Sequence, residues 1–462
     1  MALSNCTSEF FADLKGKRVA ICGIGNNNIP VVHQFLRCGA IVTACDRREY
    51  DQLGEAAAAI EKAGAALCLG EGYLDTLAEV GADMVIRTPG MKPYLPQFEQ
   101  ARACGIDVTS EMELFLKLCP AHVTAVTGSD GKTTTTAVIG GLLEAAGKTV
   151  HIGGNFGRAL LPVLDEISAE DEVVVELSSF QLTMMSQSPP TAVITNVTPN
   201  HLDWHTDMAE YIEAKHNLIA WQKSGDRTVL NADNDVTAGY SAATGVDMWR
   251  FSRKCRVEHG VWLSESGIIM VTENGQDTPV MAAGDICIPG VHNVENYMAA
   301  IAAVWGKVST DMIAAFAAQF GGVAHRCELV RELDGVRWYN DSIGSSPTRT
   351  MAGLVAFGKK VILIAGGYDK KIPYEPLGPV AADTVKIAIL LGATAPAIEK
   401  SIRACSDLPV YHVKTMEQAV SCARELATDG DIVFLSPASA SFDMYKNFEE
   451  RGNHFRTLVN DL

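Results

Sequence analysis

The segment from His122 to Gly147 constrains the fold of this chain more than any other. It reads HVTAVTGSDGKTTTTAVIGGLLEAAG: an apolar run typical of a strand, a turn bounded by glycines, and a helical pattern that ends at Gly147. A strand that leads through a glycine turn into a helix forms a phosphate site, because backbone N–H groups and the helix dipole face the anion. Lys132 adds a positive charge there, and the Thr133 hydroxyl can ligate Mg²⁺. The segment predicts nucleotide phosphate binding.

The glycine turn is shorter than a standard P-loop. The standard pattern has a glycine five residues before the Gly-Lys pair, and Val126 occupies that position here. A string as short as Gly-x-x-Gly-Lys-Thr also occurs in ordinary turns between a strand and a helix. The prediction therefore depends on the strand before the turn and the helix after it.

Length and composition predict a soluble, cytoplasmic protein of about three domains. In 462 residues, no apolar run reaches the roughly 18 residues that a membrane span needs, and the N-terminal stretch does not resemble a signal peptide. The net charge of −17 argues against a nucleic-acid partner. Twelve cysteines without a Cys-x-x-Cys pair predict neither a zinc site nor a disulfide scaffold.

The pattern of strands and helices predicts an α/β fold in three domains. Residues 1–108 form a Rossmann-like domain, residues 109–321 a central P-loop ATP-binding α/β domain, and residues 322–462 a second Rossmann-like domain. The strands are continuous apolar runs, such as 172–177 and 191–197, which are typical of parallel sheets buried on both faces. The first glycine turn, Gly23-x-Gly25 followed by Asp46, has Asn28 in place of the third fingerprint glycine. A nucleotide other than NAD, or a purely structural turn, fits it better.

Several polar residues lie where strands end. Glu176 is placed to hold Mg²⁺, and a partly exposed carboxylate is the alternative. His201, Asp203 and His205 could ligate a metal or be structural. On its helix, Lys215 is expected to be solvated from spacing alone.

Further candidates have two interpretations each. Asn155, among glycines, could approach a phosphate or a carboxylate, or cap a loop. His325-Arg326 and the run 340–342 could contact a nucleotide or act as a hinge. Ser439 or Ser441 could cap the last helix or bind an anion.

Together these motifs resemble the Mur ligases over essentially the whole chain. The resemblance rests on TGSDGKTTT, GGNFG, ELSSFQL, NVTPNHLDWH, GVHNVENYMAA, AHRCE, NDS and SPASASFDMYKNFEERGN. The strings ELSSFQL and SPASASFDMYKNFEERGN resemble the member that adds D-glutamate. The resemblance implies a cytoplasmic, ATP-dependent amide ligase of peptidoglycan synthesis, expected to be a monomer. ATP would phosphorylate the carboxylate of UDP-N-acetylmuramoyl-L-alanine, and the amine of D-glutamate would attack the acyl phosphate.

The resemblance also implies roles for individual residues. The catalytic set would be Lys132, Glu176, His201 and Lys215. Thr133 and Glu176 would hold one Mg²⁺, and His201 and carbamylated Lys215 a second. ATP would contact Gly128, Ser129, Asp130, Gly131, Lys132, Thr133, Thr134, Asn296, Arg326 and Asp341. The UDP-substrate would contact Asn26, Asn27, Arg47, Arg48, Gly90 and Asn155. D-Glutamate would contact Ser345, Lys370, Ser441 and Phe448.

Two positions depart from the family pattern. Ile343 stands where a lysine near the incoming amino acid is expected, and Asn26-Asn27 stand in place of Leu-Thr. Arg349 or Lys371 could replace the lysine, or the amino-acid site could be built differently. The alternatives are another Mur-type ligase with a different amino acid, and an ATP-binding sensor without ligase activity. The shared motifs also resemble folylpolyglutamate synthases, but those enzymes lack the N-terminal Rossmann-like domain that this sequence predicts, which argues against that alternative.

Overall fold

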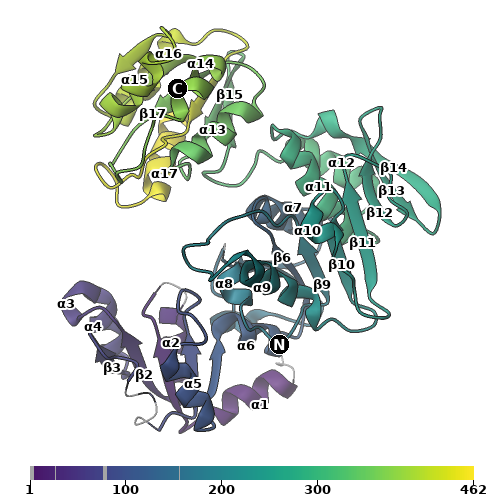
Figure 1. Cartoon of the computed structure of the whole chain (residues 1–462), viewed down its shortest axis with the longest axis vertical. Coiled ribbons are helices and arrows are strands. Elements are labelled where there is room, and N and C mark those ends of the chain that lie inside the picture. The colour runs from purple at the N-terminus through teal and green to yellow at the C-terminus, as the bar shows by residue number, and fades with distance from the viewer. Residues whose placement is uncertain (1–4, 26–27, 76, 78–80, 156) are drawn as a thin grey trace. The chain divides into compact units, whose positions relative to one another are not determined.

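The computed structural model describes residues 5–25, 28–75, 77, 81–155 and 157–462 (Figure 1). The chain forms two compact units. One comprises Met1–Met281 and Glu295–Ala314, and the other comprises Ala282–Val294 and Ala315–Leu462. Among the described residues, no helix combines the length and the apolar composition that crossing a membrane would require.

The first sheet of the first unit consists of parallel strands in the order β3-β2-β1-β4-β5. Its strands are β1 (Arg18–Cys22), β2 (Ile41–Asp46), β3 (Ala66–Leu69), β4 (Met84–Arg87) and β5 (Asp107–Ser110). Its helices are α1 (Asn5–Asp13), α2 (Asn28–Arg37), α3 (Tyr50–Leu53), α4 (Glu55–Lys62) and α5 (Pro96–Ala103). The central strands β1 and β4 are almost fully buried, as expected for strands covered on both faces.

The second sheet of this unit has the order β14-β13-β12-β11-β10-β9-β6-β8-β7. Pairing is parallel from β7 to β12 and antiparallel between β12 and β13. The strands are β6 (His122–Thr127), β7 (Val150–Gly154), β8 (Glu172–Glu176), β9 (Thr191–Ile194), β10 (Arg227–Asn231), β11 (Asp247–Ser252), β12 (Gly260–Leu263), β13 (Ile268–Glu273) and β14 (Gln276–Ala282). The helices between β5 and β15 in the chain are α6 (Glu111–Leu118), α7 (Lys132–Ala145), α8 (Ser179–Leu182), α9 (Met208–Ala220), α10 (Asp235–Ala238), α11 (Val291–Val304) and α12 (Thr310–Gln319), with the 3₁₀ turns η1 (Leu161–Glu166) and η2 (Ala283–Asp285). Of these, η2, the start of α11 and the end of α12 belong to the second unit.

The second unit contains the third sheet, in the order β15-β16-β20-β17-β18-β19. Only the pairing of β15 with β16 is antiparallel in this sheet. The strands are β15 (Glu328–Leu333), β16 (Val336–Asn340), β17 (Val361–Ala365), β18 (Val385–Leu390), β19 (Val410–His412) and β20 (Ile432–Leu435). The helices are α13 (Pro347–Ala356), α14 (Leu377–Thr384), α15 (Ala395–Arg403), α16 (Met416–Leu426) and α17 (Phe448–Asn460).

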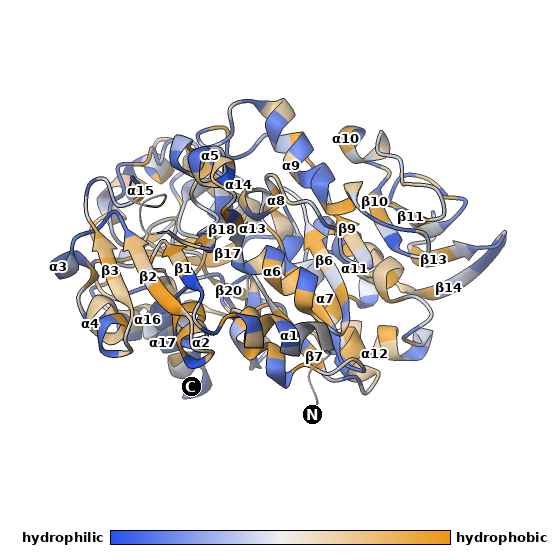
Figure 2. Ribbon diagram, turned by 90° about the horizontal axis from the view of Figure 1, so that it is seen from below, coloured by the Kyte–Doolittle hydropathy of each residue, from blue (hydrophilic) through white to orange (hydrophobic). Residues whose placement is uncertain are grey.

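The structure confirms the predicted α/β class and the prediction of buried parallel strands. β8 and β17 are buried along their whole length, and Figure 2 shows orange strands between helices that carry both orange and blue residues. The predicted boundary at 108/109 falls inside β5, which pairs with β4 as far as Ser110. The domain boundaries stay predictions.

Candidate active site

The glycine turn between β6 and α7 is fixed by hydrogen bonds to the loop that follows β9. The backbone N–H of Ser129 donates to the carbonyl of Asn196 over 2.9 Å, and the Ser129 hydroxyl donates to the carbonyl of Thr198 over 2.9 Å. Lys132 folds back over the turn, and its Nζ donates to the carbonyls of Gly128 and Ser129 over 2.9 and 3.0 Å. The lysine is thus held at the turn where a phosphate would lie.

Two glycines of the turn are required by close contacts. A Cβ on Gly128 would lie 1.9 Å from Thr195 Oγ1. Gly131 has φ +81°, and a Cβ there would lie 2.3 Å from Asn296 Oδ1. L side chains rarely adopt this φ, so glycine allows the turn to pass between the two side chains. Asn296, a predicted ATP contact on α11, therefore packs directly on this turn, the candidate phosphate loop of residues 128–133.

Lys215 lies inside the protein beside the same turn. It is only 1% exposed, and its Nζ donates to the carbonyl of Gly128 over 2.7 Å. Burial and the nearby charge of Lys132 lower the pKa of Lys215 well below its ordinary value. The expectation of a solvated lysine is wrong, because α9 turns this residue toward the phosphate loop. A lowered pKa favours the neutral, nucleophilic amine.

Glu176 ends β8 and is 2% exposed, so the alternative of a partly exposed carboxylate is wrong. Asn155 Nδ2 donates to Glu176 Oε1 over 2.7 Å. Glu176 Oε2 is buried and has no hydrogen-bond partner among the described residues. A buried carboxylate oxygen without a partner is costly unless a cation or a ligand satisfies it, so the position fits Mg²⁺. Among the described residues, no three His, Cys, Asp or Glu side chains gather into a metal site. A Mg²⁺ site here would also need hydroxyl, phosphate or water oxygens.

The two histidines after β9 differ in their surroundings. His201 has φ +54°, and partial burial and the charge of Lys132 lower its pKa, which favours the neutral imidazole that binds metals. His205 is buried, and its Nε2 forms a hydrogen bond of 2.9 Å with the Ser179 hydroxyl. Asp203 is exposed. The structure therefore gives His205 a packing role and leaves His201 beside the two lysines.

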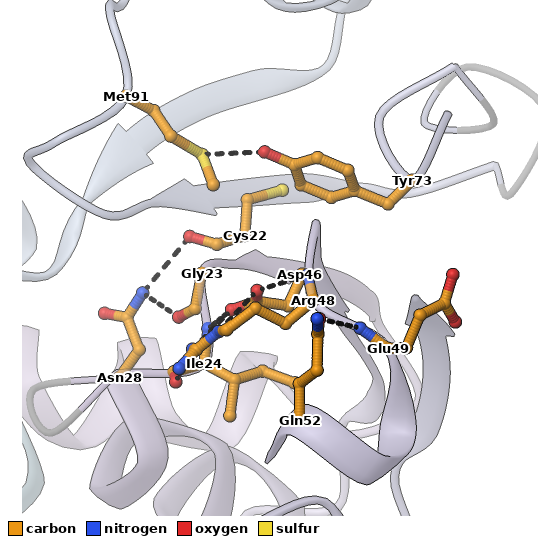
Figure 3. A network of polar contacts seen from close by, with 10 residues as sticks. All are labelled: Cys22, Gly23, Ile24, Asn28, Asp46, Arg48, Glu49, Gln52, Tyr73 and Met91. Carbon is orange, nitrogen blue, oxygen red and sulfur yellow. Dashed lines mark hydrogen bonds and ion pairs between the residues drawn. The ribbon is translucent and has the colours of Figure 1, made fainter. Parts of the chain in front are cut away.

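The first glycine turn is held by Asp46, as Figure 3 shows. Its carboxylate accepts four hydrogen bonds, one from the Ile24 N–H and three from Arg48. A carboxylate has about four acceptor positions, so this acid is not free to bind a ribose as in an NAD site. Asn28, in the place of the third fingerprint glycine, donates to the carbonyls of Cys22 and Gly23 over 3.3 and 3.0 Å.

Two other predicted contacts of the UDP-substrate, Arg47 and Gly90, lie in loops that follow strands of the same sheet. Arg47 follows β2 and is exposed, and Gly90 follows β4 and is exposed. Arg48 also donates to the carbonyl of Ile24 over 2.6 Å, so part of its donor capacity stabilises the turn. Asn26 and Asn27 lie outside the described residues.

In the second unit, Asp341 follows β16 and is buried. It accepts hydrogen bonds from the Ser436 hydroxyl over 2.8 Å and from the Cys327 N–H over 3.2 Å. Burial raises its pKa to about 6, although the charges of Arg326 and Arg349 oppose the shift. A Cβ on Gly344 would lie 2.5 Å from Asp341 Oδ2. Asp341 and Arg326, both predicted ATP contacts, thus interact electrostatically.

Asn340 and His325 are structural residues of this unit. Asn340 is fully buried, and its Nδ2 forms hydrogen bonds with His325 Nδ1 and with the carbonyl of Gly452, over 3.1 and 3.2 Å. His325 has φ +62° and packs against Gly452, where a Cβ would lie 2.2 Å from His325 Nδ1. Neither side chain is oriented for a ligand in this arrangement.

The predicted amino-acid contacts differ in exposure. Ser441 is buried and its carbonyl accepts from the N–H groups of Met444 and Tyr445, while Lys370 is exposed. Ser345 is half-buried in the loop before α13, and Phe448 is the first residue of α17.

The predicted capping role of Ser439 or Ser441 is wrong. The Asn447 side chain caps α17 by accepting from the Glu450 N–H over 2.8 Å. Ser439 instead forms hydrogen bonds of 2.8 Å with the hydroxyls of Tyr374 and Thr394. The chain runs on for several residues between Ser441 and the start of α17, so the serines lie too far from the helix to cap it.

Comparison with known proteins identifies the family. The model described as "Mur ligase middle domain" matches residues 126–304, and the model described as "Mur ligase, glutamate ligase domain" matches residues 325–439. The chain belongs to the Mur ligase family. A relative in Acetivibrio thermocellus is 50% identical over 98% of both chains, and one in Ruminiclostridium cellulolyticum is 46% identical over 100% of both. Both are named UDP-N-acetylmuramoylalanine–D-glutamate ligase.

Solved structures of other Mur ligases share the fold. The UDP-N-acetylmuramate–alanine ligase of Thermotoga maritima has a TM-score of 0.57 and 18% identity, over 96% of this chain and 99% of the other. The MurF ligase of Thermotoga maritima in complex with ADP has a TM-score of 0.55 and 18% identity, over 98% and 97% of the two chains. These likenesses confirm the three-domain α/β architecture of a Mur ligase.

Sequence reasoning missed Arg451, a buried residue of this Mur ligase. It is 2% exposed and donates to the carbonyls of Ser342, Ser439 and Ala440, over 2.8, 3.1 and 3.0 Å. Burial lowers its pKa to about 10, so the cation persists at neutral pH. Arg451 therefore joins the loops after β16 and β20. The helical spacing of Arg451 to the buried Phe455 was the signal that could have found it.

Proposed function

We propose that this chain is an ATP-dependent ligase that joins D-glutamate to UDP-N-acetylmuramoyl-L-alanine. The observation that carries the proposal is the group at the phosphate loop formed by the partly buried Lys132 and the buried Glu176 and Lys215. It occurs in a chain that is half identical, along its whole length, to a protein named for this reaction. Among the described residues, no carboxylate forms an ion pair with Lys215. Burying this lysine therefore costs stability, and a catalytic role accounts for keeping it.

The reaction forms an amide in two steps. A carboxylate oxygen of the substrate attacks the γ-phosphorus of ATP, and the bond from that phosphorus to the β–γ bridging oxygen breaks, which releases ADP. The amine of D-glutamate then attacks the carbonyl carbon of the acyl phosphate. The tetrahedral adduct loses inorganic phosphate and a proton. Lys132 holds the β- and γ-phosphates and offsets the negative charge that gathers on them.

The chain offers two positions for Mg²⁺. Thr133 and Glu176 would hold one ion, which fits Glu176 Oε2, a buried oxygen with no hydrogen-bond partner in the described part of the chain. His201 and Lys215 would hold the second. When bound, Mg²⁺ neutralises charge on the phosphate oxygens. Thr133 is buried in the first turn of α7, next to Lys132.

Lys215 would serve as a metal ligand after carbamylation. Its neutral amine adds to the carbon of CO₂ and loses a proton, which converts a cation into an anionic oxygen ligand. The lowered pKa of Lys215 supports this step, because only the neutral amine reacts. The anion would also remove the repulsion between Lys215 and Lys132.

The substrates divide among the parts of the chain. The UDP-substrate contacts residues 1–108 through Asn26, Asn27, Arg47, Arg48 and Gly90, and Asn155 of the central domain 109–321. ATP contacts the loop from Gly128 to Thr134 and Asn296, and Arg326 and Asp341 of domain 322–462. D-Glutamate contacts Ser345, Lys370, Ser441 and Phe448. The protein acts in the cytoplasm as a monomer. Size-exclusion chromatography with light scattering tests the monomeric state.

The test is phosphate release from ATP with UDP-N-acetylmuramoyl-L-alanine and a panel of single amino acids. We expect release with D-glutamate and none with L-glutamate, L-alanine or a diamino acid. Release with no amino acid in the panel would contradict the ligase assignment.

One observation favours a second candidate, a Mur ligase for another amino acid. Ile343 replaces the lysine that the family pattern places near the incoming amino acid. Arg349, whose charge reaches Asp341, is better placed to replace it than Lys371, which pairs with Asp369 over 3.2 Å. Release with a different amino acid in the same panel would support this candidate.

A further inference from the structure

Two loops of the first unit are joined by a tryptophan. The loop after β4 carries Gly90, and the loop after β9 carries His201 and Trp204. Trp204 Nε1 donates to the carbonyl of Gly90 over 3.0 Å. The two residues are far apart in sequence and lie in loops that follow strands of different sheets, so this bond connects a loop of the first sheet to a loop of the second.

The indole is held on several sides. Its ring lies 4.6 Å from the ring of Phe180 and 4.7 Å from that of His205, centroid to centroid. Lys92 Nζ lies over the indole at 5.6 Å, from the same loop as Gly90. Contacts of this kind are each worth up to about 1 kcal/mol at exposed sites, so the ring is restrained as well as hydrogen-bonded.

Trp204 is also tied to His201 through the backbone. The N–H groups of Trp204 and His205 both donate to the carbonyl of His201, over 3.1 and 3.0 Å. His201 itself has φ +54°, a conformation that L residues adopt only when their surroundings hold it. A shift of Trp204 would therefore move His201.

A second tie runs parallel to the first. Tyr94, from the Gly90 loop, donates its hydroxyl proton to Glu210 Oε1 over 2.8 Å, and Glu210 Oε2 accepts from the Thr206 N–H over 2.5 Å. This tie ends at the same loop, two residues beyond Trp204.

We propose that Trp204 is a positioning residue that couples the UDP-substrate loop at Gly90 to the metal loop at His201. The inference rests on the proposed function for the roles of these two residues. A UDP-substrate that orders the Gly90 loop fixes its carbonyl, which fixes the indole and thereby the His201 turn. By linkage, a metal–nucleotide complex held through His201 strengthens binding of the UDP-substrate by the same factor.

The experiment compares Trp204→Phe with wild type. Phenylalanine keeps an aromatic ring against Phe180 and removes the N–H donor to Gly90 together with one ring of the indole. The matched control is Trp221→Phe, because Trp221 Nε1 donates to the carbonyl of Met185 over 3.1 Å, a bond of the same kind elsewhere in the unit. Calorimetry gives the Kd of Mg²⁺ with a non-hydrolysable ATP analogue, without and with saturating UDP-N-acetylmuramoyl-L-alanine. The ratio of the two Kd values is the coupling factor.

We expect a coupling factor above one in wild type and in Trp221→Phe. Trp204→Phe should lower the factor by about fivefold, the worth of one hydrogen bond, and leave the Kd measured without UDP-substrate unchanged. A wild-type factor of one, or an unchanged factor in Trp204→Phe, would overturn the inference. So would a Trp204→Phe variant that weakens both Kd values equally, because that result indicates a structural role only.

A second variant tests the inference even if Trp204→Phe does not fold. Tyr94→Phe removes the parallel tie from a side chain that is 37% exposed, and it should lower the coupling factor by a smaller amount. An unchanged factor in Tyr94→Phe would overturn the inference if Trp204→Phe does not fold. Coupling is measured by binding alone, whereas the proposed function is tested by phosphate release in wild type, so the two can fail separately.

Discussion

Replacing Lys215 with methionine should abolish turnover and make the protein more stable at neutral pH. Methionine fills a similar volume without a charge. The native amino group is 1% exposed, donates to the carbonyl of Gly128 and faces the charge of Lys132. The wild-type protein therefore bears a desolvation cost at this position that methionine removes.

The magnitude follows from the pKa of Lys215, which is lower in the folded state than in the unfolded state. Between the two pKa values the unfolded chain binds the extra proton, so wild-type stability rises with pH. The slope is at most about 1.4 kcal/mol per pH unit, and it ends near the ordinary lysine pKa of about 10.4. Below the folded pKa the cost is complete and constant. Lys215→Met lacks this dependence, so its advantage should shrink as pH rises.

Urea unfolding in CO₂-depleted buffer, followed by tryptophan fluorescence at pH 7, 8 and 9, measures the effect. Lys148→Met is the matched control, because the side chain of Lys148 is exposed. Adding bicarbonate should stabilise wild type and leave Lys215→Met unchanged, since a carbamate can form only on the lysine. A difference in free energy of unfolding that does not vary with pH would refute the reasoning.

Three further changes test other parts of the site. Asn155→Ala removes the donor to Glu176 Oε1 and should raise the Mg²⁺ concentration needed for half-maximal activity about 10- to 100-fold. Rates that do not recover with added Mg²⁺ would contradict a role of Asn155 through Glu176. Asp341→Asn should gain roughly 3 kcal/mol in free energy of unfolding relative to wild type between pH 4 and pH 7. The reason is that the pKa of Asp341 is raised to about 6 in the folded state, so wild-type stability falls as pH rises from about 4 to about 6. Urea unfolding of both proteins at pH 4 and pH 7 measures this, and a difference in free energy of unfolding that is the same at both pH values would contradict it. Arg451→Met leaves buried carbonyls without donors and should lower the free energy of unfolding by about 3 kcal/mol; an unchanged urea midpoint would contradict this.

The central sheet and the phosphate loop were predictable from sequence because their signals are local. A continuous apolar run predicts a strand buried on both faces, and β8 and β17 are buried throughout. The glycines that the motif requires are those where a Cβ would meet Thr195 or Asn296. A strand-end acid next to such a loop, here Glu176, could be found in the same way.

The burial of individual polar side chains was not predictable from spacing. Lys215 lies on a helix of mixed polarity, and only the packing of α9 on the phosphate loop shows that its amine is buried. The buried guanidinium of Arg451 is satisfied by carbonyls of two loops distant in sequence. The N-cap of α17 is Asn447. From sequence alone, Ser439 and Ser441 were equally good N-cap candidates, and only the position at which the helix begins identifies Asn447.

The missing glycine of the phosphate loop has a structural reason. Val126, at the position of the first P-loop glycine, is a fully buried residue of β6. It pairs in register with Glu176 on β8 and with Val193 on β9. The strand thus continues for two residues where a standard P-loop would already have turned, and Glu176 stands beside the strand just before Gly128. A glycine at 126 would weaken this pairing. The short loop therefore aligns the carboxylate with the turn proposed to bind phosphate. Val126→Gly should loosen that alignment and raise the Mg²⁺ concentration needed for half-maximal activity, while leaving Lys132 in place.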